Sequence, residues 1–183
     1  NMVKTLFCAL EHMKEGEDLV ISYGDIVFET GVIRAVIDCD APIVTAIDRD
    51  WRKYWELRLD DPLDDAESLI LRDGEYIAEI GHKPQNYDQI QGQYIGLTKV
   101  RADYVRKFLE AWQAMDREAL YDGQSFNKMY MTSFLQHLID TGTPIRAAFI
   151  HNGWLEVDTI QDLEIYEELH ARGRLREFII LGG

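Results

Sequence analysis

The sequence predicts an α/β fold in which helices flank a mixed, mostly parallel β-sheet. Short apolar runs of strand length alternate along the chain with longer segments whose apolar residues recur at helical spacing. Turn signals separate these runs, among them Asp73-Gly74 and Asn152-Gly153. The 183 residues, 46% hydrophobic and 28% charged, have the size and balance of one folded domain.

The first predicted elements are a helix over residues 3–13 and a strand over residues 19–23. The helix follows from apolar residues spaced three or four positions apart, and the strand follows from a short, mainly apolar run that stops at Gly24. Residues 32–37 return to helical spacing, and residues 42–47 form a second apolar run of strand length.

Asp50 is a suitable N-cap residue, so a helix is expected to begin at Trp51 and to include Arg58. Residues 68–71 and 76–80 flank the dipeptide Asp73-Gly74. Asp-Gly between two strand runs is a strong β-hairpin signal. The sequence therefore predicts a hairpin insertion in the sheet.

Residues 81–91 are polar and are expected to form a loop, after which residues 93–100 alternate as a strand. Helical spacing returns over residues 102–115 and again over residues 128–140. Gly142 follows the second of these helices and is expected to end it.

Residues 145–150 and 154–157 are strand-like runs. Thr159 is a suitable N-cap for the helix that follows, and Asp162 stands in the capping-box position three residues later. The apolar tail over residues 177–181 predicts a last strand.

The charge of the chain limits its partners. A formal net charge of −14 argues against nucleic acid and anionic membrane surfaces, because both are bound mainly by neutralising phosphates. No apolar run is long enough to cross a bilayer. Cys8 and Cys39 lack disulfide or metal-ligand spacing and are interpreted as reduced thiols, which favours a cytoplasmic protein.

Two carboxylates follow strand runs at positions that suit a metal ion. Asp25 comes after the strand over residues 19–23 through a single glycine, and Asp158 follows the strand over residues 154–157. Ligands of such sheets bind beyond the carboxyl ends of the strands, and Mg²⁺ prefers carboxylates and phosphate oxygens. The alternative is that each aspartate only caps a turn.

Other candidate contacts are a lysine and several aromatic residues. Lys83 precedes Pro84 in the polar loop and could contact a phosphate, or it could be an ordinary solvated lysine. Trp51, Trp55 and Trp154 could bind an ammonium group through cation–π attraction, or they could pack in the core. The five histidines show no metal-ligand spacing.

Four segments, taken in order, resemble the sugar-phosphate and choline-phosphate nucleotidyltransferases. They are LVISYGD at residues 19–25, EIGHKP at 79–84, GQYIGL at 92–97 and GWLEVDT at 153–159, the last followed by QDLE at 161–164. The resemblance implies a nucleotide-diphospho-sugar transferase-like fold. It also implies attack of an acceptor phosphate on the α-phosphorus of a nucleoside triphosphate, most simply CTP, with release of pyrophosphate.

The same resemblance implies roles for individual residues. Asp25 and Asp158 would coordinate Mg²⁺ and, with Lys83 on the acceptor phosphate, would be the catalytic residues. The substrate contacts that it implies are Trp51, Trp55, Tyr94, Gly96, Trp154 and Glu156. The aromatic segment over residues 48–55 is more similar to the branch that uses phosphocholine or aminoalkyl phosphonates than to the sugar 1-phosphate branch.

One departure from the family pattern concerns the nucleotide. The family begins with a strand and a Gly-rich loop that hold the base and the triphosphate, and residues 1–183 contain no such loop. These residues would thus form a single domain equivalent to about the C-terminal two-thirds of the family domain. We expect an incomplete nucleotide site and self-association that covers the sheet edge left unpaired.

Two other functions fit parts of the pattern. A non-catalytic binding or regulatory domain could keep this scaffold without turnover, which the missing Gly-rich loop favours. A glycosyltransferase-like domain would also use metal-binding aspartates, but it usually carries an Asp-x-Asp motif, whereas Asp25 is followed by Ile26 and Val27.

Overall fold

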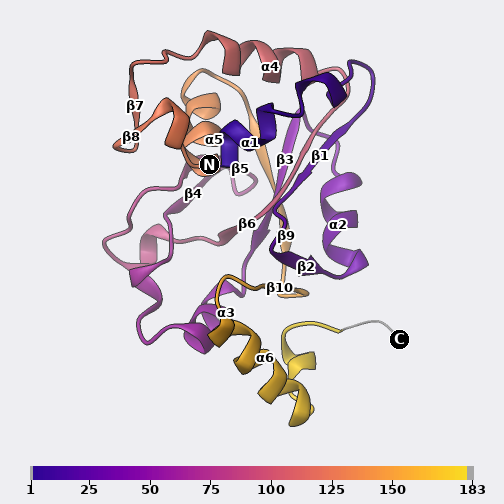
Figure 1. Cartoon of the computed structure of the whole chain (residues 1–183), viewed down its shortest axis with the longest axis vertical. Helices are drawn as coiled ribbons and strands as arrows, with labels where there is room; N and C mark the ends of the chain where they lie inside the picture. The colour runs from indigo at the N-terminus through magenta and orange to yellow at the C-terminus, as the bar shows by residue number, and fades with distance from the viewer. Residues whose placement is uncertain (1, 181–183) are drawn as a thin grey trace.

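A computed structural model describes residues 2–180 and has a six-stranded sheet at its centre (Figure 1). The strands of this sheet are β1 (Leu19–Ser22), β3 (Ile43–Asp48), β4 (Leu69–Arg72), β5 (Tyr76–Ile80), β6 (Gln93–Val100) and β9 (Ile145–Ile150). Their spatial order is β1-β6-β3-β9-β5-β4. The central strand β3 is buried along its whole length, as its mainly apolar sequence predicts.

The sheet is mixed. The pairing of β3 with β9 is parallel, whereas β1–β6, β6–β3, β9–β5 and β5–β4 are antiparallel. Strands β1, β3, β4 and β9 therefore run in one direction, and β5 and β6 run in the other. The predicted mixed α/β class is confirmed. The expectation that the sheet is mostly parallel is wrong, because four of its five neighbouring strand pairs are antiparallel.

Helices cover both faces of the sheet. They are α1 (Met2–Phe7), α2 (Thr30–Ile37), α3 (Trp51–Arg58), α4 (Val105–Ala114), α5 (Met131–Asp140) and α6 (Ile160–Ala171). Alternate residues of β3 point to opposite faces, so Ile43 and Ile47 pack in the core beneath α1, α4 and α5. Val44 and Ala46 pack in a second core with side chains of α2, α3 and α6.

Two small sheets stand apart from the central one. Strand β2 (Ile26–Phe28) pairs with β10 (Trp154–Glu156), and β7 (Leu120–Tyr121) pairs with β8 (Gln124–Ser125). In Figure 1 the β2–β10 pair lies between the lower end of the central sheet and α6. This pair places the residue before β2 beside the residues that follow β10.

Short 3-10 turns complete the described chain. They span Leu10–His12, Pro62–Asp64, Tyr87–Gln89, Phe126–Lys128 and Leu175–Glu177. The predicted hairpin is confirmed as β4–β5, whose strands are joined by residues 73–75. Asp73 (φ 56°) and Gly74 (φ 74°) both adopt the positive φ of a type I′ turn.

Three expectations about local structure are wrong. The first helix ends at Phe7 instead of residue 13, and the chain continues into a 3-10 turn at Leu10–His12. The side chain of Asp50 does not cap α3; instead the Asp50 N–H donates to Asp48 Oδ1 at 2.9 Å.

The third wrong expectation is the predicted last strand over residues 177–181. Up to Ile180, the last described residue, the tail forms a 3-10 turn and no strand, and Leu181 lies outside the described residues. Phe178 and Ile179 are buried against the core that contains α3 and α6, so side-chain packing fixes this segment in place of strand pairing.

Strand β1 forms one edge of the central sheet. It pairs with β6 on one side, and none of the described strands pairs with its other side. Val20 on this strand is 43% exposed.

Among the described helices, none combines the length and the apolar character that crossing a membrane requires.

Candidate active site

The pairing of β2 with β10 brings Asp25 next to Asp158. The register places Ile26 opposite Glu156, so the residue before β2 lies beside the residues that follow β10. The Val157 N–H donates to the Asp25 carbonyl oxygen at 2.9 Å and fixes this arrangement. Two aspartates 133 positions apart in the sequence thus meet at one place.

Glu156 joins the two aspartates. One carboxylate oxygen from each of Asp25, Glu156 and Asp158 lies within 4.8 Å of the others. Side chains at alternate positions of a strand share a face, and β10 therefore presents Trp154 and Glu156 on the side that Asp158 continues. Three carboxylates this close form a hard-oxygen donor set that suits a divalent cation such as Mg²⁺.

The electrostatics of the group agree with a cation site. Burial raises the pKa of Glu156 above its ordinary value, and the negative charges of Asp158 and Asp25 raise it further, whereas Arg58 lowers it. A bound cation would reverse this effect by stabilising the ionised form. The residues present therefore fit the metal ion that the aspartate positions predict.

Arg58 lies behind the carboxylates at the end of α3. Its Nη1 donates to Glu156 Oε2 at 3.0 Å and its Nη2 to Asp158 Oδ2 at 2.9 Å. Its Nε donates to Asp162 Oδ1 at 2.8 Å, and the Asp162 side chain also takes part in the capping box of α6 with Thr159. The predicted capping box is thereby confirmed, and it connects α6 to the site.

Two tyrosines position the backbone of Glu156. The Glu156 N–H donates to Tyr54 Oη at 2.8 Å, and Tyr166 Oη donates to the Glu156 carbonyl oxygen at 2.7 Å. The two hydroxyls are 2.5 Å apart. Glu156 is thus held by hydrogen bonds from α3 and α6 as well as by β2.

A cavity of about 310 Å³ opens beside the three carboxylates. Acidic and aromatic side chains dominate its wall, and none of its described lining residues is a lysine, arginine or histidine. The acidic members are Asp25, Asp65, Glu67, Glu156 and Asp158, and the aromatic members are Tyr23, Trp55, Tyr94, Tyr130 and Trp154. The cavity is thus built to receive a group that is positively charged or is accompanied by a cation.

The two tryptophans of the cavity are held by their indole N–H groups. Trp55 Nε1 donates to Asp65 Oδ2 at 2.9 Å, and Trp154 Nε1 donates to Asp48 Oδ2 at 2.8 Å. Trp154 is 2% exposed and Trp55 is 6% exposed. Both side chains are buried in the core and also line the cavity, so core packing and contact with a bound ammonium group are not exclusive alternatives for them.

Tyr94 and Gly96 contribute in different ways. Tyr94 lines the cavity and packs edge-to-face on Tyr23 with ring centroids 5.7 Å apart. Gly96 does not line the cavity; it has φ +83°, and a Cβ there would lie 2.4 Å from Cγ of Tyr23. Gly96 therefore acts by allowing the Tyr23 ring to reach the cavity wall.

Lys83 and Trp51 lie outside the cavity wall. Lys83 Nζ donates to the carbonyl oxygens of Leu63 and Asp64 at 2.5 and 2.6 Å. Trp51 is buried and packs edge-to-face on Trp55 at 5.8 Å. Their contacts with a substrate stay predictions.

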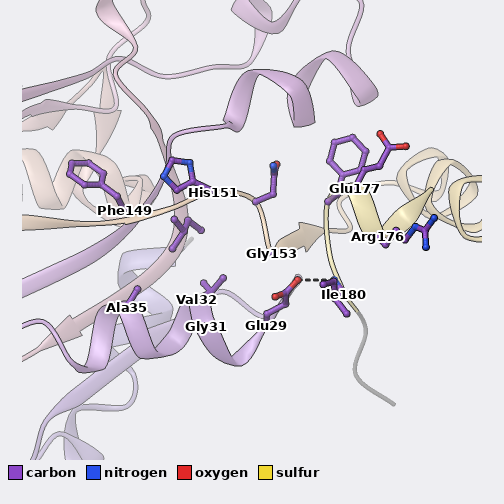
Figure 2. Close-up of a pocket in the computed structure, with 13 residues that line it drawn as sticks. Glu29, Gly31, Val32, Ala35, Phe149, His151, Gly153, Arg176, Glu177 and Ile180 are labelled. Carbon is purple, nitrogen blue, oxygen red and sulfur yellow. Dashed lines mark hydrogen bonds between the residues drawn. The ribbon is translucent and has the colours of Figure 1, made fainter. Parts of the chain in front are cut away.

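A larger cavity, of about 460 Å³, lies elsewhere between α2, the loop after β9 and the tail (Figure 2). Figure 2 shows the Glu29 carboxylate directed at Ile180, whose N–H donates to Glu29 Oε1 at 2.7 Å. None of the residues predicted to bind substrate or metal lines it. Size alone therefore does not identify the active site here.

Several site residues carry no clear signal in the sequence. Arg58, Asp65 and Glu67 reach the site from a helix end and an acidic turn that resemble ordinary solvated segments. The position of Glu156 beside Asp158 could have been predicted, because Trp154, Glu156 and Asp158 alternate and so share a face.

Comparison with known proteins identifies relatives of the whole chain. No family model matches it. It is 40% identical over 172 residues to a CTP:phosphoglutamine cytidylyltransferase from Campylobacter jejuni, and this match covers 92% of the chain and 68% of the relative. The chain therefore spans about two-thirds of that protein's length.

Solved structures share the fold. An inositol-1-phosphate CTP transferase from T. maritima superposes with a TM-score of 0.61 at 18% identity, over 98% of this chain and 64% of that chain. A Bacillus anthracis protein assigned as a glucose-1-phosphate thymidylyltransferase gives a TM-score of 0.63 at 13% identity, over 100% of this chain and 63% of its own. At these identities the likeness concerns the fold alone.

Proposed function

Because the chain belongs to the nucleotidyltransferase family of the Campylobacter jejuni cytidylyltransferase, we propose that it carries the cation-binding and acceptor-binding part of a cytidylyl transfer site. The observation that carries the proposal is the meeting of Asp25, Glu156 and Asp158 beside an acidic, aromatic cavity. This is the geometry that a phosphorylated acceptor accompanied by a divalent cation needs.

The proposed reaction joins the acceptor to the nucleotide. An oxygen of the acceptor phosphate attacks the α-phosphorus of CTP and forms a new P–O bond, while the bond from that phosphorus to the bridging oxygen breaks. Pyrophosphate leaves with the electron pair. No covalent intermediate on the protein is needed, so the chain's residues act by positioning the reactants and by charge stabilisation.

Each part of the site has a role in this proposal. Asp25, Glu156 and Asp158 would hold Mg²⁺, whose charge would offset that of the phosphates. Trp55, Tyr94 and Trp154 would form the wall against which the acceptor lies. Two further carboxylates line the cavity, Asp65, which accepts from Trp55 Nε1, and Glu67, which accepts from Thr132 Oγ1. Neither is assigned a cation in this proposal.

We therefore propose that the acceptor carries an ammonium group. A quaternary or primary ammonium is attracted both by carboxylates and by aromatic faces. Phosphocholine and phosphoglutamine, the substrate named for the relative, each offer such a group, whereas a sugar 1-phosphate does not. The relative's acceptor thus agrees with the charge of this cavity.

Calorimetric titration in the presence of Mg²⁺ tests this choice of acceptor. We expect phosphocholine or phosphoglutamine to bind roughly tenfold more tightly than glucose 1-phosphate, a difference of about 1.4 kcal/mol. Tighter binding of glucose 1-phosphate would contradict the ammonium proposal. Failure of every phosphorylated acceptor to bind would contradict the acceptor site itself.

A turnover assay distinguishes the proposed cytidylyl transfer from the alternative of a non-catalytic binding domain. Release of pyrophosphate from CTP in the presence of the preferred acceptor would establish transfer by the chain as it stands. If the chain binds acceptor and cation but releases no pyrophosphate, it acts as a binding domain on this scaffold.

The free edge of β1 is the basis of a proposal about assembly. Its outer side is unpaired among the described strands, and an exposed apolar edge strand tends to pair with another chain. We propose that a second copy covers it. Sedimentation should then show a mass that rises with concentration, and a monomer at every concentration would contradict this.

A further inference from the structure

Arg58 and Asp162 are more deeply buried than Glu156 and Asp158, the other two carboxylates that Arg58 contacts. Its side chain is 10% exposed and that of Asp162 is 7% exposed, and two hydrogen bonds of 2.8 and 3.2 Å join them. The Asp162 carboxylate is itself held by the N–H groups of Asp158 and Thr159 at 3.1 and 2.8 Å. Arg58 and Asp162 thus form a buried pair that ties the end of α3 to the start of α6.

From this pair the guanidinium reaches outward to the proposed cation ligands. Glu156 is 21% exposed and Asp158 is 48% exposed, so burial decreases in the direction of the site. Arg58 donates to one oxygen of each of these two carboxylates, Glu156 Oε2 and Asp158 Oδ2. The second oxygen of each carboxylate is left for another ligand.

We propose that Arg58 is a positioning residue that holds Glu156 and Asp158 facing Asp25 and so prepares the three carboxylates for a divalent cation. The inference rests on the proposed function, because it concerns the same carboxylates. A planar guanidinium with several N–H donors in fixed directions can hold three carboxylates at once, which a lysine ammonium on a flexible stem does not do.

The charge of Arg58 and its positioning role predict opposite effects on cation binding, so the two can be distinguished by experiment. A positive side chain near a cation site repels the cation, so an effect of charge alone predicts that Arg58→Gln tightens cation binding. Positioning predicts the opposite. It predicts weaker binding for Arg58→Gln and also for Arg58→Lys, although the lysine keeps the charge.

Mn²⁺ binding followed by electron paramagnetic resonance measures the effect without any turnover. We expect Arg58→Lys and Arg58→Gln to weaken Mn²⁺ binding roughly tenfold or more, as loss of a partner that orients metal ligands does elsewhere. The matched control is Arg101→Lys, since Arg101 pairs with Asp40 and Asp103 away from the cavity. It should bind Mn²⁺ as the wild type does.

Thermal unfolding and circular dichroism identify any variant that has lost its fold. In that case Asp162→Asn replaces it, because this change removes the anchor of Arg58 and leaves the three carboxylates intact. It should weaken Mn²⁺ binding in the same way. Unchanged or tighter binding in folded Arg58→Lys, or unchanged binding in Asp162→Asn, would overturn the proposal.

The same titration separates this inference from the proposed function. If the wild-type chain does not bind Mn²⁺, the proposed cation site fails and Arg58 has nothing to position there. If the wild type binds and Arg58→Lys binds equally well, only the role of Arg58 fails.

Discussion

At the scale of single residues, Glu67 is a partly buried carboxylate of the cavity wall that does not belong to the proposed cation site. Burial raises its pKa above the ordinary value of 4.5, and the negative charges of Asp65 and Asp122 act in the same direction. Thr132 Oγ1 donates to Glu67 Oε1 at 3.3 Å and lowers the pKa in part. Ionised Glu67 is therefore costly unless a cation lies next to it.

This cost predicts a pH dependence of acceptor binding. As the pH falls through the raised pKa, Glu67 takes up a proton and affinity for an ammonium-bearing acceptor should fall. Glu67→Gln should weaken that acceptor roughly threefold to tenfold at neutral pH, consistent with about 0.7–1.4 kcal/mol for one partly buried charge. It should also remove this part of the pH dependence in calorimetry.

The stability of the chain should change with pH in the opposite sense. Since the folded state binds this proton more strongly than the unfolded state, Glu67 costs stability as pH rises from 4.5 through the raised pKa. Glu67→Gln should remove that loss. Glu79→Gln is the control, because Glu79 accepts from Ser68 Oγ outside the cavity wall. Equal effects of the two changes would contradict the role of Glu67.

Single residues also show why some roles could be predicted and others could not. Asp25 and Asp158 stand at the ends of strand runs, so the sequence itself marks them. The substrate contact of Gly96 stays a prediction; what the structure adds is its close approach to the ring of Tyr23, 73 positions earlier, which no local pattern reveals. Lys83 resembles a phosphate ligand in sequence, and its amine bonds to loop carbonyls in the structure.

At the scale of elements, segments with a clear local signal were predictable, and segments that depend on a distant partner were not. The β4–β5 hairpin and the capping box of α6 follow from local signals, Asp-Gly and Thr159 with Asp162. Strand β2 has three residues and no period of its own, and it exists because β10 pairs with it. This unpredicted strand is the one that brings Asp25 to Glu156.

The tail around Phe178 and Ile179 is a second case in which the local sequence did not determine the element. Its apolar residues matched a strand pattern, but burial of Phe178 and Ile179 against the core is achieved without strand pairing. An apolar run requires burial, and it does not specify how the backbone hydrogen bonds are made. Tertiary packing decided the outcome here.

At the scale of the whole molecule, the site is assembled from segments that only the fold brings together. The wall of the acidic cavity draws on residues between Met2 and Asp158, from α1, the β1–β2 turn, α3, β6, α5 and β10 among others. The mixed α/β class could be predicted from alternating strand and helix runs. The convergence of these segments depends on sheet order and register, which composition and periodicity do not determine.

The central claim is that Asp25 and Asp158 bind one divalent cation together with Glu156. Mn²⁺ titration of Asp25→Asn and Asp158→Asn tests it most directly, with Asp73→Asn as the control because Asp73 lies in the exposed β4–β5 turn. We predict that each of the first two changes weakens Mn²⁺ binding by roughly tenfold or more in a folded chain, and that the control does not. Binding of Mn²⁺ by Asp25→Asn and Asp158→Asn with wild-type affinity would contradict the claim.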